Sequence, residues 1–326
     1  MNYELNKFLS SRYALLLMMA IAVMAAVAAY LHGDVVPITG AKGLGLPSAN
    51  EWLHPGMLSL GVNLALNIGI ACLLVLINKS FNILRNLTVL FSNIFMVMQT
   101  ATPSVIGQFY GGTLLCIVNL LAMCLLFSTF GKRQPDRRNI FLVFFMLSLG
   151  TLTQYAYALY IPVFLIGCVQ MRCLSFKGFL AAMIGVVTPV WILWGLGVID
   201  FHNVALPQFV SIFSALNRHE AAQLIATVAL TISLTIGFGA LNFIKIYSYN
   251  SRARAYNGFI GIMALATMAF AVADYTNTAI YIPMLNTCAA FQAAHFFTIN
   301  RWRRADIPVL TLIAAYLALY VWALYA

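Results

Sequence analysis

The sequence predicts an all-α, polytopic integral membrane protein with about eleven transmembrane helices. Composition and charge placement are the observations behind this prediction. Of the 326 residues, 63% are hydrophobic and only 8% are charged, too few ionisable groups to cover a water-exposed surface. Apolar runs of helix length follow one another along the chain, with basic residues between them. We therefore expect residues 1–326 to form a single transmembrane domain whose main solvent is lipid.

The longer apolar runs are near the ~20 residues that a helix needs to cross a hydrocarbon core. In chain order they cover residues 13–31, 57–77, 110–130, 178–197, 222–243, 257–273, 277–296 and 307–325. The shorter runs 87–101, 140–154 and 157–171 hold about 15 residues each, which suits short tilted helices or half-helices. The last two form a hairpin that turns near Gln154, and this hairpin either crosses the membrane fully or re-enters it.

The basic residues predict the orientation of the chain. Of the 18 Lys and Arg residues, only Lys42 and Arg218 fall outside the segments that would share a side with the N-terminus. The positive-inside rule places those segments in the cytoplasm, which gives an N-in, C-out topology in a bacterial inner (cytoplasmic) membrane. Residues 13–31 also resemble a secretory signal, but the run is longer than a typical signal core, so we expect an uncleaved anchor.

Several classes of function lose support from what the sequence lacks. It contains no GxxxxGK[ST], HExxH, GxSxG or CxxC motif. The six cysteines lie in or beside apolar runs without a neighbouring histidine, so we expect neither disulfides nor a metal site. The net charge of +10 is spread between the apolar runs, and we expect no nucleic-acid binding. The lack of a secure mid-span charge argues against an ion-coupled transporter.

The first external loop, residues 32–56, contains the candidate catalytic residues Asp34, Glu51 and His54. Its prolines and glycines favour a loop folded back on the membrane rather than a free tether. A carboxylate there could act as base or acid, with His54 as an auxiliary donor. The alternative is a solvated loop with two unrelated carboxylates, since acidic residues are tolerated in external loops. The same topology also places three further acidic residues on the external side: Asp200, Glu220 and Asp274.

Polar side chains recur within the spans, and interhelical hydrogen bonding is their simplest role, with a polar substrate pathway as the alternative. The stretch "TQYAYALYIP" places Tyr155, Tyr157 and Tyr160 near the outer interface, as an aromatic belt or as a ligand-stacking surface. The polar positions are Asn63, Asn67, Asn93, Gln99, Asn119, Gln154, Asn242, Asn286, Gln292 and His295.

Residues 144–195 also carry a resemblance: "FFMLSLGTLTQYAYALYIPVFLIGCVQMRCLSFKGFLAAMIGVVTPVWILWG". This stretch resembles the part of GT-C type, polyprenyl-phosphate-sugar-dependent glycosyltransferases where a small-residue helix leads to a turn, a proline-containing helix, basic residues and a further span. The GT-C-like part covers residues 1–200. The first loop has no adjacent acidic pair, and Gln154 stands where the family commonly has a lysine. The chain also resembles an uncharacterised family of multi-spanning bacterial inner-membrane proteins.

The GT-C resemblance implies transfer of a sugar or related group from a lipid carrier at the periplasmic face. Its partners would be membrane lipid and a polyprenyl-phosphate-linked sugar. We expect no cofactor, although a divalent metal would suit a GT-C-like enzyme. An inactive relative, or a non-enzymatic transporter or envelope-assembly subunit, is the alternative. The residues that the resemblance would assign are Asp34, Glu51 and His54 for catalysis, and Gln154, Tyr155 and Tyr157 for substrate binding.

Overall fold

The computed structural model describes residues 11–32, 43–84, 88–132, 136–199, 216–246, 249–299 and 306–325. These residues form helices and turns, with no strand among them. Two short 3-10 helices, η1 (Ala49–Glu51) and η4 (Tyr275–Asn277), lie in connections. The α-helices are α2 (Arg12–His32), α3 (Met57–Phe81), α4 (Leu90–Thr100), α5 (Pro103–Ile106), α6 (Gly111–Phe127), α7 (Arg137–Thr153), α8 (Ala156–Gln170), α9 (Phe176–Gly195), α10 (Arg218–Ile246), α11 (Ser251–Ala273), α12 (Thr278–Ile299) and α13 (Asp306–Tyr325).

Within the described ranges, 6 helices are long and apolar enough to cross a bilayer: α2, α3, α9, α10, α11 and α13. By length and composition they indicate a membrane protein, and the predicted all-α class is confirmed. Every predicted apolar run coincides with one helix, with bounds that agree to within a few residues at most ends. The number of helices that cross the membrane, and the N-in orientation, stay predictions.

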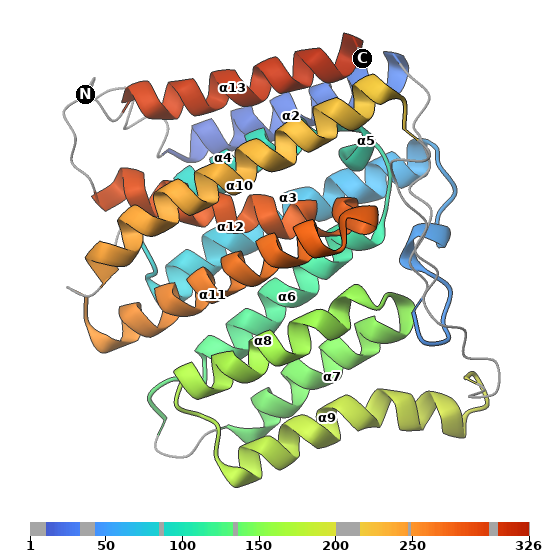
Figure 1. Cartoon of the computed structure of the whole chain (residues 1–326), viewed down its shortest axis with the longest axis vertical. Coiled ribbons are helices and arrows are strands. Elements are labelled where there is room, and N and C mark those ends of the chain that lie inside the picture. The colour runs from blue at the N-terminus through green and yellow to red at the C-terminus, as the bar shows by residue number, and fades with distance from the viewer. Residues whose placement is uncertain are drawn as a thin grey trace.

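The helices lie side by side in one bundle, with α13 and α2 at one edge and α9 at the opposite edge (Figure 1). The interior is formed by α12, which packs against α4, α6, α10 and α11, and by α4, whose residues are all buried. At about 1.5 Å rise per residue, α4 covers only about half of a hydrocarbon core. Because protein surrounds α4, lipid does not reach the non-helical backbone beyond its end.

The two ends of the bundle differ in charge. We call the end with residues 43–56, α5, the α7–α8 turn and η4 the loop end, and the opposite end the basic end (Figure 1). Arg218 starts α10 at the loop end. The other described basic residues belong to the basic end, and they are Arg12, Lys79, Lys132, Arg137, Arg138, Arg172, Lys177, Lys245, Arg252 and Arg254.

Buried amides join the helices, as the sequence predicts. The Asn63 side chain on α3 accepts a hydrogen bond from Thr113 Oγ1 on α6 at 2.7 Å. Asn286 on α12 donates to Gln99 Oε1 on α4 at 2.9 Å. The interhelical role is confirmed for these residues, each worth about 1 kcal/mol in lipid. Asn119 on α6 differs, because neither atom of its buried amide has a partner among the described residues.

Candidate functional site

The described part of the first loop is folded onto the α7–α8 hairpin. Leu44 N donates to Thr151 O at 3.3 Å, and Leu46 N donates to Leu152 O at 3.0 Å. A Cβ on Gly43 would lie 2.3 Å from Leu152 O, so this close approach of two backbones requires glycine. From residue 43 onward the loop is therefore structured and packs on the bundle, as expected for a loop that is not a free tether.

The side chain of Gln154 connects the first loop to the bundle by hydrogen bonds. The residue ends α7 in an extended conformation, with φ −151° and ψ 128°, and its side chain is fully buried. Its Nε2 atom lies 3.3 Å from both Ser48 Oγ and Asn50 Oδ1 in the first loop. Asn50 Oδ1 also accepts from Gly111 N, the start of α6, at 2.7 Å. We call these four residues the Gln154 joint; Gln154 is therefore placed to hold the loop.

Of the predicted catalytic residues, Glu51 and His54 are both exposed. Trp52 between them donates Nε1 to Pro47 O at 3.2 Å and stacks on Phe109 with ring centroids 6.3 Å apart. The loop thus has an anchoring ring and two side chains directed to its open surface. Asp34 lies outside the described residues.

The three predicted belt tyrosines have different surroundings. Tyr157 and Tyr160 are 3% and 0% exposed and belong to the core, so an interfacial belt is wrong for both. The ring of Tyr157 covers Gly150, where an added Cβ would lie 2.3 Å from its Cδ1. Tyr160 hydrogen-bonds Thr267 on α11 at 3.0 Å. Tyr155 alone is partly exposed, and it faces a carboxylate.

That carboxylate is Asp274, which ends α11 and is half-buried at the loop end. Its Oδ2 accepts from the hydroxyls of Tyr155 at 2.5 Å and Tyr281 at 2.9 Å. Its Oδ1 accepts from Asn277 Nδ2 at 3.0 Å and Thr276 Oγ1 at 3.2 Å. Asn277 Nδ2 also donates to the Tyr155 hydroxyl at 2.6 Å. These five residues, the Asp274 cluster, bring together the α7–α8 turn, the α11–α12 turn and α12.

The electrostatics of the cluster follow from its composition. A carboxylate has about four lone-pair sites, and the four donors above occupy them. The described residues give Asp274 no ion pair, and the protein groups that solvate its charge are hydroxyls and an amide. Burial and the adjacent Asp274 carboxylate raise the pKa of Tyr155 well above its usual range. Tyr155 therefore stays a neutral donor throughout the physiological range, next to a negative acceptor.

The predicted topology places Asp274 outside, but the sequence does not connect this residue with Tyr155. The signal that could have found the pair is the topology itself, since the turn near Gln154 and the end of α11 were both predicted on the external side. The described residues contain no group of three His, Cys, Asp or Glu side chains that could hold a metal ion.

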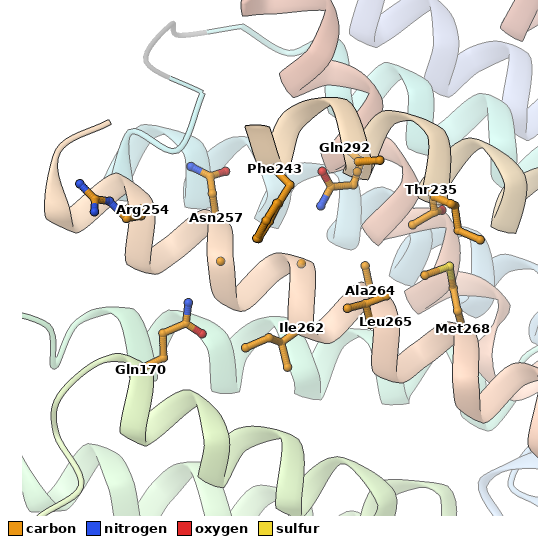
Figure 2. Close-up of a pocket in the computed structure, with 15 residues that line it drawn as sticks. Gln170, Thr235, Phe243, Arg254, Asn257, Ile262, Ala264, Leu265, Met268 and Gln292 are labelled. Carbon is orange, nitrogen blue, oxygen red and sulfur yellow. The ribbon is translucent and has the colours of Figure 1, made fainter. Parts of the chain in front are cut away.

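A second feature is a groove of about 560 Å³ between α10 and α11. Figure 2 shows Arg254, Asn257 and Gln170 at one end of it and Leu265 and Met268 at the other. The groove lies toward the basic end and is separate from the Asp274 cluster.

No known protein family matches the chain, and no curated protein or solved structure is detectably similar to it.

Proposed function

We propose that the protein is a GT-C-like membrane transferase that moves a sugar or related group from a lipid carrier to an acceptor hydroxyl, with Asp274 as the base. The observation that carries the proposal is the Asp274 cluster, a half-buried carboxylate with donors from two turns and a helix at one end of a membrane bundle. The loop end faces the periplasm of a bacterial inner membrane in this proposal. A polyprenyl-phosphate-linked sugar is the donor substrate.

The route of a substrate to Asp274 follows from the four hydrogen bonds that its carboxylate already accepts. Because four donors fill its acceptor sites, a substrate hydroxyl reaches Asp274 only by displacing one of them. Tyr155 is the partly exposed donor to Oδ2, whereas Tyr281 is fully buried. The acceptor hydroxyl replaces Tyr155 at Oδ2, and the Tyr155 phenol turns to donate to the phosphate of the lipid carrier.

Transfer then proceeds by attack of the acceptor hydroxyl on the donor sugar. Asp274 takes the proton of the acceptor hydroxyl, and the acceptor oxygen forms a bond to the anomeric carbon of the sugar. The bond between that carbon and the phosphate oxygen breaks, and the lipid phosphate leaves with the electron pair. The neutral Tyr155 phenol donates a hydrogen bond that stabilises the developing charge on the phosphate oxygen.

The test measures transfer of radiolabelled sugar from lipid carriers in membranes that contain the protein. Asp274→Asn removes the base, and we expect transfer to fall by at least about 100-fold, the lower end of general-base contributions. Tyr155→Phe also breaks the cluster but keeps the carboxylate, and we expect it to lower transfer by less than Asp274→Asn does, because the base remains. Glu51→Gln and His54→Ala should transfer like the wild type. Full activity of Asp274→Asn would overturn the proposal.

A second candidate is a non-enzymatic membrane subunit, such as a transporter or an envelope-assembly component. One observation favours it: Asp274 is fully hydrogen-bonded, as a carboxylate that joins three segments would be. The two candidates separate in the same assay. A structural joint predicts that Asp274→Asn and Tyr155→Phe lose folded protein together, with no transfer in any variant or in the wild type.

A further inference from the structure

The groove between α10 and α11 opens at membrane depth, because both helices are among those long and apolar enough to cross a bilayer. From Arg254 to Met268 it follows α11 for about 21 Å, at about 1.5 Å per residue. Its α10 wall includes Ile236 and Phe243, whose side chains are 56% and 60% exposed. The solvent at such a surface is lipid chains, so the groove is a furrow in the lipid-facing wall of the bundle.

Each amide that lines the groove makes a hydrogen bond to another protein atom, although Gln170 Oε1 has no partner among the described residues. Gln170 Nε2 donates to Ala255 O at 3.2 Å, and Asn257 Nδ2 donates to Ala253 O at 2.9 Å. Gln292 Oε1, on α12, accepts from an asparagine of α10 at 2.9 Å. Along most of its length the groove therefore presents apolar surface. This favours an occupant that is itself a hydrocarbon chain.

Arg254 differs from the rest of the lining. Its side chain is exposed at the basic end of the groove, and its Nη2 donates to Tyr249 O at 3.1 Å. A guanidinium has five N–H donors, so this bond leaves others available. The described residues give Arg254 no ion pair. A cation at one end of an apolar furrow matches an amphiphile with an anionic head and a long tail.

We propose that this groove binds the acyl chain of an anionic membrane phospholipid, with the headgroup phosphate on Arg254. The guanidinium forms charge-assisted hydrogen bonds with the phosphate oxygens. The chain runs along α11 past Gly261 toward Met268. Gly261 leaves room for it, because a Cβ built there would meet no atom within 4 Å. This site is independent of the Asp274 cluster and of transfer chemistry.

The proposal is tested by native mass spectrometry. The delipidated protein, purified in detergent, is titrated with phosphatidylglycerol, and the bound lipid is measured. Arg254→Gln removes the phosphate contact, and we expect the tightest binding step to weaken about tenfold, the equivalent of one charged hydrogen bond. Gly261→Leu fills the groove and should weaken the same step by at least about tenfold, for phosphatidylcholine as well as phosphatidylglycerol.

Two matched variants serve as controls. Arg252→Gln removes an exposed cation from the same helix turn, outside the groove lining. Gly237→Leu adds the same side chain on α10, outside the lining and also where a Cβ would meet no atom within 4 Å. Both should bind phosphatidylglycerol as the wild type does. The proposal fails if Arg254→Gln binds as tightly as Arg252→Gln, or Gly261→Leu as tightly as Gly237→Leu.

Discussion

Two sets of polar side chains lie at the loop end of the bundle, and they differ in exposure and in hydrogen bonding. Glu51 and His54 are close in sequence, and both are exposed. Asp274 and Tyr155 are 119 positions apart, and the fold brings them into a hydrogen bond. Glu51 and His54 thus lie near one another only through the loop sequence, whereas the convergence of two turns brings Asp274 and Tyr155 into contact.

Thiol labelling should show the largest difference between an exposed and a buried position at the loop end. In a cysteine-free background, a cysteine in place of exposed Glu51 should react with an impermeant maleimide in intact cells. A cysteine in place of Gln154, which is fully buried beneath the loop, should stay protected at the same end. Lys132→Cys, at the basic end, should react only after the membrane is permeabilised. Labelling of Lys132→Cys in intact cells would reverse the predicted orientation.

Removal of the Asp274 carboxylate should have the largest effect on stability. Asp274→Leu leaves two phenols, an amide and a hydroxyl without their acceptor, and we expect the free energy of unfolding to fall by about 3 kcal/mol. Glu51→Leu, in solvent, should change it by less than about 0.5 kcal/mol. Reversible unfolding in mixed micelles measures both. Equal effects would remove the distinction between the two regions.

A smaller loss is expected at the Gln154 joint. A Cβ on Gly111 would lie 2.0 Å from Gln154 Oε1, so Gly111→Ala should cost about 2 kcal/mol of unfolding free energy. Gly69→Ala on α3 is the control, because a Cβ there meets nothing within 4 Å and alanine favours helix. If the clash is the cause, Gln154→Ala should recover part of the loss in the double variant. No recovery would assign the loss to the backbone.

The sequence predicts the helices well because the signals for them are local. The apolar run 57–77 corresponds to α3, Met57–Phe81, and the hairpin turn predicted near Gln154 lies between α7 and α8. The predicted interfacial belt was wrong for Tyr157 and Tyr160, because burial depends on which other helices pack against each residue. Tyr160 contacts α11 and Tyr157 packs on Gly150 of α7, and no local sequence pattern reports such contacts.

The contacts of the Asp274 cluster could not be predicted from the sequence. Asp274 was recognised only as an external carboxylate at the end of a helix, since its role depends on contacts with Tyr155 and Tyr281 from other segments. The role of Gln154 in substrate binding stays a prediction, and the structure adds that its buried side chain contacts Ser48 and Asn50 of the first loop. Both sets of contacts come from the packing of two turns and a loop, which apolar periodicity does not encode.

A double-mutant cycle on unfolding free energy tests the central claim, convergence on Asp274, most directly. Asp274→Asn and Tyr155→Phe, alone and together, should give a coupling energy of about 1.5 kcal/mol, typical of a hydrogen bond to a charged group. The same cycle with Glu51→Gln and His54→Ala should give a coupling within about 0.3 kcal/mol of zero, as for independent sites. Zero coupling between Asp274 and Tyr155, or a larger coupling between Glu51 and His54, would contradict the account.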